Sequence, residues 1–403
     1  MADTSLMTPQ GKPPRRPPEG GPLPALAQKA LHGTLLDAEA AYALMEWPLE
    51  ALDGLLEVAS ALRDRHHGRH LTYSPKVFLP VTNLCRDKCS YCTFRKSAKD
   101  PAAKTMSLDE IADWSRKGHQ LGCKEALMCL GDRPETVYPT YHEILRRVGV
   151  ETTAEYVELA CRASLREGLL PHTNAGLLTR AELERLRPVN VSMGLMLENI
   201  SPRLRQKGQA HAAAPDKEPA LRLAMIEQAG ELRIPFTTGV LVGIGETARE
   251  LADSLLAIRE LHQKWGHIQE IIVQTFRTKP DVPMRDHPEM SDLELAKVLA
   301  ISRLLMPTMN LQAPPNLTPR GHLLMIRAGI NDWGGISPLT MDFINPEAPW
   351  PHLDALAETC RQAGYTLGER LPIYPEYLRG DEFLDPTLRG AVESAQQRIP
   401  APC

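Results

Sequence analysis

The sequence has 403 residues, of which 43% are hydrophobic and 24% charged, and its formal net charge is -4. These values are typical of a globular protein and give no electrostatic reason to expect nucleic acid or an anionic membrane as a partner. No apolar run approaches the roughly 18–20 residues that a membrane-spanning helix needs. Three of the eight cysteines lie close together and the others show no paired pattern, so we expect a reducing compartment, the cytoplasm.

The N-terminal part of the chain precedes any strand pattern. Residues 11–24 (GKPPRRPPEGGPLP) are rich in proline and carry basic residues, so we predict a disordered leader over residues 1–24. Residues 35–65 carry two helical patterns that are separated around Trp47 and Pro48. They fall within an N-terminal helical segment predicted over residues 25–70.

From residue 71 onward, apolar runs alternate with amphipathic stretches. Ser107, Thr152 and Thr179 are each followed three residues later by Glu, which is typical of a helix start. The alternation predicts an α/β fold, a TIM-like (β/α) barrel, full or partial, over residues 71–377. The candidate strands are 77–82, 126–130, 169–173, 190–197, 236–242, 268–276 and 309–313, with a short eighth near 335–336. A helix is predicted at 351–363, an irregular chain from residue 371, and a C-terminal tail over 378–403.

Polar or glycine-rich segments follow the predicted strands. In chain order they are CRDKCSYC, LGDRPE, HTNAG, MLE, GVLVGIGE, QTFR, APPN and DWGG. The carboxyl ends of parallel strands share one rim of a barrel, and such folds carry their chemistry there. The sequence therefore predicts a functional site at this rim.

Three cysteines with short spacing follow the first predicted strand. Cys85, Cys89 and Cys92 form a CxxxCxxC motif, and three thiolates so close together can bind three irons of a 4Fe–4S cluster. The fourth iron would then be open to another ligand. A structural zinc site completed by His70 or Cys123 is the alternative, although zinc sites usually come as two paired knuckles.

A CxxxCxxC motif after a first barrel strand resembles the signature of the radical S-adenosylmethionine (SAM) superfamily. The resemblance implies a barrel of the radical SAM type, with a 4Fe–4S cluster and SAM as cofactors. It also implies SAM contacts at the matching positions, which are Tyr91, Gly131, Asp132, Glu198, Arg222, Gly239 and Gly243. LGDRPE departs from the GGE-like segment usual there, and Gly131-Asp132 is also an ordinary turn dipeptide. Tyr91 is also open to a packing role, and Arg222 to a place on a solvated helix face.

Longer stretches resemble one family within that superfamily. LPVTNLCRDKCSYCTF, GLLPHTNAG, IPFTTGVLVGIGET and NDWGGISPLTMDFINPE are similar to the first radical SAM component of deazariboflavin (FO) synthase. The resemblance implies a lyase that cyclises the adduct of tyrosine and 5-amino-6-ribitylaminouracil to 7,8-didemethyl-8-hydroxy-5-deazariboflavin, with release of ammonia. That product is a precursor of the deazaflavin coenzyme F420. Only one CxxxCxxC motif occurs, so the second radical SAM component is expected as a separate protein, with a reductase, ferredoxin or flavodoxin as electron donor.

A substrate of this kind is rich in hydrogen-bonding groups, which side-chain amides, carboxylates and aromatic rings at the rim could recognise. The candidates are Asn174, Gln274, Asn316 and Asp332, with Trp333 for stacking and His172 as the histidine expected nearby. Asn174 is also open to a turn-capping role and Asn316 to a loop-forming one. Two other functions stay open: a related radical SAM enzyme with another substrate, and a non-catalytic zinc or cluster-binding protein.

Overall fold

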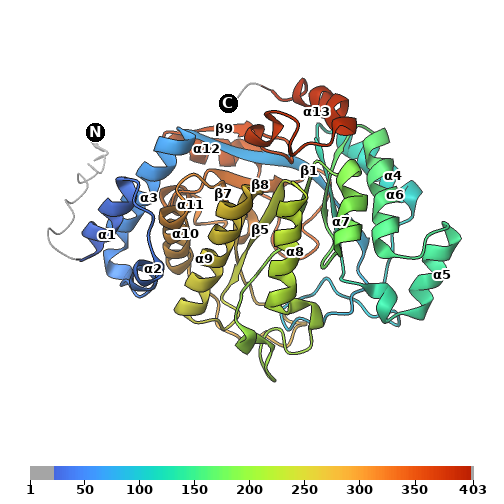
Figure 1. Ribbon diagram of the computed structural model, residues 1–403, viewed down its shortest axis with the longest axis horizontal. Helices are drawn as coiled ribbons and strands as arrows, with labels where there is room; N and C mark the ends of the chain where they lie inside the picture. Colours follow the sequence, from blue (N-terminus) through green and yellow to red (C-terminus); the bar gives the residue numbers. More distant parts are fainter. Residues whose placement is uncertain (1–21, 401–403) are drawn as a thin grey trace, which may run out of the picture.

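A closed barrel of parallel strands forms the centre of the molecule (Figure 1). The computed structural model describes residues 22–400, and the predicted leader lies outside them except for its last three residues. The strands follow one another around the barrel in chain order, and β1 closes it by pairing with both β2 and β8. Their bounds are β1 His70–Thr82, β2 Glu125–Leu130, β3 Leu170–Asn174, β4 Ser192–Gly194, β5 Phe236–Val242, β6 Ile268–Thr275, β7 Leu311–Gln312 and β8 Asp332–Ile336. The predicted barrel is therefore confirmed.

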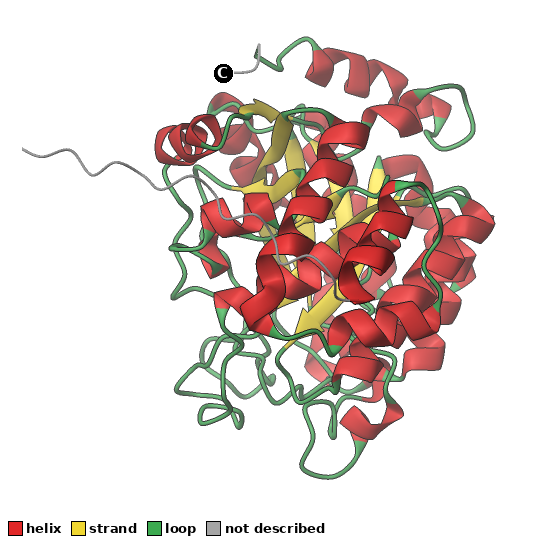
Figure 2. Ribbon diagram, turned by 90° about the vertical axis from the view of Figure 1, so that its left-hand side faces the viewer, coloured by secondary structure: helices red, strands yellow, loops and turns green. Residues whose placement is uncertain are grey.

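Helices surround the strands, and long loops gather at one end of the barrel (Figure 2). The helices after the first strands are α4 Leu108–Gln120, α5 Pro139–Arg147, α6 Thr153–Arg166, α7 Arg180–Leu186 and α8 Pro219–Glu231. Those after the later strands are α9 Ala248–Trp265, α10 Asp292–Leu305, α11 His322–Arg327 and α12 Leu353–Gln362. The capping boxes predicted at Ser107, Thr152 and Thr179 are all present, because each side chain accepts a hydrogen bond from the Glu three residues later.

Side chains along β1 alternate between the outer face of the barrel and its interior. Val77, Leu79 and Val81 are fully buried. Val77 packs so closely on α4 that a Cβ at Gly118 would lie 2.0 Å from it. Lys76 and Phe78 alternate with these residues and line a cavity inside the barrel. The interior of the barrel is therefore partly polar, while its outer face forms the hydrophobic core with the helices.

Three N-terminal helices pack beside α9 and α10 (Figure 1). They are α1 Pro22–Leu31, α2 Ala38–Met45 and α3 Leu52–His67, so the predicted break around Trp47 and Pro48 is present. Arg63 is fully buried and donates hydrogen bonds to the carbonyls of Ile326 and Ile330. None of the described helices is long and apolar enough to cross a membrane.

The C-terminal segment differs from its prediction. A ninth strand, β9 Thr366–Glu369, pairs with the start of β1, and a helix, α13 Arg389–Gln396, follows it. The strand precedes residue 371 and was not predicted, whereas the helix lies in the chain from residue 371 that was expected to be irregular. This helix is short and lacks a capping side chain. Leu371, Ile373 and Val392 bury their side chains in a second small core against Leu170 of β3. The segment covers the end of the barrel opposite the long loops (Figure 1).

Candidate active site

The cysteine loop lies at the rim, between β1 and α4. Cys85 is buried, and Cys89 and Cys92 are partly exposed. Neighbouring segments hold the loop by its backbone, because Lys88 N–H donates to the Ala213 carbonyl and Ser90 N–H donates to the Ala210 carbonyl, both at 2.9 Å. The conformation of the loop is therefore fixed by the segment that follows β4.

Gly131 packs directly against this loop. A Cβ at Gly131 would lie 2.0 Å from the Leu84 carbonyl oxygen and 2.5 Å from the Cys85 Cβ, so no larger residue fits. The next residue, Asp132, donates its backbone N–H to the Cys85 Sγ at 3.1 Å. The LGD segment therefore supports the cysteine loop through its backbone.

The surroundings of the three thiols disagree with the zinc alternative. His70 begins β1 and bonds to Thr366, and Cys123 precedes β2, so both lie at the end of the barrel opposite the cysteines. Neither can complete a zinc site. Burial raises the pKa of the Cys85 thiol to about 12, so its thiolate needs a bound metal cation as a partner. The N–H donated to Cys85 Sγ is the kind of hydrogen bond that tunes cluster sulfurs.

Glu198 organises a second group of side chains next to the cysteine loop. The Tyr91 hydroxyl and the Lys217 ammonium both donate to its carboxylate, and His211 Nε2 lies 3.0 Å from it. Burial alone would raise the pKa of Glu198, but the charge of Lys217 and the hydrogen bond from His211 hold it well below its ordinary value. Glu198 also has a left-handed backbone (φ 63°), which an ordered site has to maintain.

Arg222 and a group of buried carboxylates also lie near the loop. Arg222 is only 3% exposed and donates to the carbonyls of Met196 and Asp216, so the solvated-face alternative for it is wrong. Ligand atoms of Asp87, Asp132 and Asp216 lie within 4.8 Å of one another. Burial and the charge of Asp216 raise the pKa of Asp132 to about 7. Asp132 also accepts the Leu177 N–H at 3.1 Å, so it is more than a turn residue.

The glycines predicted from GVLVGIGE have different local roles. A Cβ at Gly239 would lie 2.0 Å from the Ile272 carbonyl oxygen, so this glycine allows β5 to lie close to β6. Gly243 has a φ of 86°, a conformation that favours glycine, and Glu246 caps the turn by accepting its backbone N–H. Both glycines therefore shape the strand end beside Glu198.

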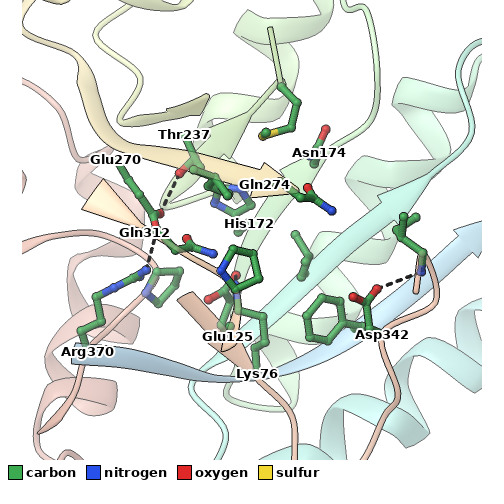
Figure 3. Close-up of a pocket in the computed structure, with 18 of the residues that line it drawn as sticks. Lys76, Glu125, His172, Asn174, Thr237, Glu270, Gln274, Gln312, Asp342 and Arg370 are labelled. Atoms are coloured by element: carbon green, nitrogen blue, oxygen red, sulfur yellow. Dashed lines mark hydrogen bonds and ion pairs between the residues drawn. The ribbon is translucent and has the colours of Figure 1, made fainter. Parts of the chain in front are cut away.

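Two neighbouring cavities lie between the cysteine loop and the barrel interior. A cavity of about 80 Å³ is lined by Tyr91, Cys92 and Glu198. A cavity of about 160 Å³ lies inside the barrel (Figure 3). Met196, Gln274 and Ile344 line both of them. The two cavities are therefore neighbours that share part of their walls.

The inner cavity has a polar floor towards the amino ends of the strands. We use "floor" for the side chains of Lys76, Glu125, His172, Glu270, Gln312 and Arg370. Figure 3 shows Arg370, Glu270 and Gln312 on one side of the cavity and Asn174, Gln274 and Asp342 towards the other. Apart from His172, these floor residues were missed from the sequence. Single charged residues within buried strands, such as Glu270 in IQEIIVQT, are the pattern that could have indicated them.

The structure separates the predicted substrate contacts. Asn174 and Gln274 line the inner cavity, as does His172. Asn316 lies behind it and donates to Asp342, a cavity residue, at 3.0 Å. The rim positions predicted for Asp332 and Trp333 are wrong, because DWGG forms β8 itself and places Asp332 at the opposite end. Trp333 is fully buried against His322 of α11, with ring centroids 5.2 Å apart, and does not line the cavity.

Known proteins match most of this chain. Residues 79–258 match the family model described as the radical SAM superfamily. The chain is 46% identical over 310 residues to 7,8-didemethyl-8-hydroxy-5-deazariboflavin synthase of Methanopyrus kandleri, which covers 77% of this chain and 93% of that one. It is 47% identical over 375 residues to FO synthase of Streptomyces coelicolor, covering 90% of this chain but only 43% of that longer protein. The chain thus spans less than half the length of the FO synthase that it matches.

Solved structures share the fold. The FeFe-hydrogenase maturase HydG from Carboxydothermus hydrogenoformans superposes with a TM-score of 0.70 at 20% identity, covering 93% of this chain and 85% of that one. Methylornithine synthase superposes with a TM-score of 0.64 at 20% identity, covering 84% and 96%. At this identity the similarity establishes the architecture alone.

Proposed function

The chain belongs to the radical SAM superfamily and, within it, to the deazariboflavin synthases, and from this premise we propose that it cyclises the tyrosine–5-amino-6-ribitylaminouracil adduct to 7,8-didemethyl-8-hydroxy-5-deazariboflavin with release of ammonia. The observation that carries the proposal is a polar cavity inside the barrel that adjoins a second cavity beside the cysteine loop. Its lining of amides and paired charges suits a substrate rich in hydrogen-bonding groups.

Cys85, Cys89 and Cys92 would hold the 4Fe–4S cluster, and Tyr91, Asp132, Glu198 and Arg222 lie around the place for SAM. When bound, these cofactors supply the radical that abstracts hydrogen from the substrate. Gly131, Gly239 and Gly243 contribute space and backbone shape rather than side-chain contacts. Lys217 keeps Glu198 ionised, so Glu198 can accept hydrogen bonds from SAM hydroxyl or ammonium groups.

The remaining residues would position the substrate and keep water away. Asn174 and Gln274 turn their amides towards the inner cavity. Phe78 and Trp350 stack with ring centroids 5.2 Å apart, and Ile344 lies beside both cavities. Apolar cover of this kind excludes solvent and competing hydrogen donors from a reactive species.

Two partner proteins belong to the proposal. The second radical SAM component would supply the adduct. A reductase, ferredoxin or flavodoxin would supply the electron to the cluster. FO synthases of about twice this length would then unite both components in one protein.

The test is an anaerobic assay of the reconstituted protein. Iron, sulfide, dithionite, SAM and the adduct are added, and 5′-deoxyadenosine, ammonia and fluorescent deazaflavin are measured together. We expect all three products from the wild-type protein and none from Cys89→Ala, which loses a cluster ligand but keeps the barrel. Formation of 5′-deoxyadenosine without deazaflavin would contradict the substrate assignment and leave the superfamily unaffected.

A further inference from the structure

The ionised groups at the floor are already paired with one another. Lys76 Nζ lies 2.7 Å from Glu125, and Arg370 lies 2.9 Å from Glu270 and 2.6 Å from Asp332. These charges are buried except for Lys76, which is partly exposed, and each carboxylate keeps a cationic partner. A charged ligand would have to compete with these pairs, so the floor favours a neutral ligand.

Neutral polar groups at the cavity are, in contrast, free to bind. Within the part of the chain that the structure describes, the side-chain amides of Asn174, Gln274 and Gln312 make no hydrogen bond, although all three line the cavity. Gln312 is buried and the other two amides are partly buried, and a polar group that loses water without gaining a partner costs free energy. A ligand that both donates and accepts hydrogen bonds would satisfy them.

The hydrogen bonds of Ser192 determine the tautomer of His172. The Ser192 hydroxyl donates to the Pro372 carbonyl at 2.5 Å, so its proton is used. His172 Nδ1 lies 2.7 Å from the same hydroxyl oxygen and must therefore carry the proton that it donates there. Nε2 then has a lone pair and, among the described residues, no partner. His172 thus offers a hydrogen-bond acceptor beside the cavity.

The two glycines of DWGG make room for the floor. A Cβ at Gly334 would lie 1.8 Å from the Gln312 amide nitrogen, and a Cβ at Gly335 would lie 2.0 Å from Lys76 Cε. Gly334 also has a φ of 73°, which favours glycine. The backbone of β8 therefore leaves space for the Gln312 and Lys76 side chains, and the position of Gln312 depends on the glycine at 334.

We propose that Gln312 and His172 form the subsite for the ribitylaminouracil end of the substrate, so that this end lies at the floor and the phenol end lies at the rim. The inference rests on the proposed function. A pyrimidinedione offers an N–H between two carbonyls, which an amide can match with two hydrogen bonds, and its ribityl chain offers further hydroxyls. The acceptor on His172 Nε2 receives one of these donors.

The opposite orientation suits the cavity less well. A phenol has one polar atom, and at the floor it would leave most of the free polar groups without partners. The rim side offers the stacked rings of Phe78 and Trp350 with Ile344, which suit an aromatic ring. This orientation also places the tyrosine-derived carbons nearer Gln274, which lines both cavities.

The experiment measures binding by calorimetry with the anaerobically reconstituted, SAM-loaded protein. The probes are 6-ribitylaminouracil, which lacks the reactive amine, and L-tyrosine. Gln312→Met keeps the length of the side chain but removes the amide, and Gln312→Asn keeps the amide but shortens it. Gln120→Leu, an exposed glutamine at the end of α4, is the matched control. Cluster absorbance and SAM cleavage without substrate report whether each variant is intact.

We expect Gln312→Met to weaken binding of 6-ribitylaminouracil about tenfold or more, which corresponds to the loss of one or two hydrogen bonds. Binding of tyrosine, cluster absorbance and uncoupled SAM cleavage should stay unchanged, and Gln120→Leu should match wild type. Unchanged binding of 6-ribitylaminouracil to Gln312→Met, weaker binding of tyrosine instead, or no binding of 6-ribitylaminouracil to wild type would each overturn the inference. Failure of the proposed function appears separately, as wild-type protein that forms no deazaflavin from the adduct.

Discussion

The cysteine loop and the floor of the barrel are both functional regions, but the chain builds them differently. At the rim, three thiols come from one loop of eight residues, held by backbone hydrogen bonds to neighbouring loops. At the floor, the charged side chains come one at a time from β1, β2, β6 and the residue after β9, and each is fixed by another charge. The rim therefore depends on backbone shape, and the floor depends on side-chain pairing across the barrel.

The largest effect that separates the two regions is expected from Gly131→Ala. Its Cβ would collide with the Leu84 carbonyl oxygen at 2.0 Å, so the cysteine loop must move. We expect loss of most of the bound iron and of SAM cleavage, with little change in the unfolding midpoint, because the loop adds little to the core. Iron analysis and urea unfolding measure the two quantities.

Gly54→Ala is the control for this substitution. Gly54 lies in α3 with nothing within 4 Å of its Cβ position, and Ala favours a helix. This variant should keep wild-type iron content. Full iron content in Gly131→Ala would show that the loop tolerates displacement and that backbone shape does not control the rim.

A smaller effect, on stability instead of iron content, is expected from Arg370→Leu. Removing this guanidinium leaves Glu270 and Asp332 buried without their cation, which typically costs about 3–5 kcal/mol of unfolding free energy. We expect a lower urea midpoint with unchanged iron per folded protein. The exposed pair of Arg389 and Asp381 provides the control, since Arg389→Leu should cost less than about 1 kcal/mol. Iron loss in Arg370→Leu would show that floor and rim are coupled.

The difference between rim and floor explains which parts of the fold and of the site could be predicted from the sequence. The barrel follows from the alternation of apolar runs and capped helices, and the cysteines follow from their spacing, since both patterns are local. Lys76, Glu125 and Arg370 carry no local pattern, because their partners lie on other strands. DWGG was placed at the rim because its glycines suggest a loop, whereas they make room for Gln312 and Lys76 within β8.

The smallest effect concerns the histidine at the floor. Burial lowers the pKa of His172 from 6.5 to about 4, so the unfolded chain binds more protons than the folded one between these values. Stability should therefore fall as the pH falls from about 6.5 to about 4. His172→Gln should make this decline shallower in urea unfolding measured across that range.

His267→Gln is the control that distinguishes a histidine at the cavity from a histidine that is only buried. Burial also lowers the pKa of His267 to about 4, but this side chain bonds to the Ile226 carbonyl and does not line the cavity. Both variants should therefore reduce the pH dependence of stability to a similar degree, whereas only His172→Gln should weaken binding of 6-ribitylaminouracil. Equal weakening by both substitutions would mean that the probe responds to general destabilisation, and that the acceptor on His172 Nε2 does not contact it.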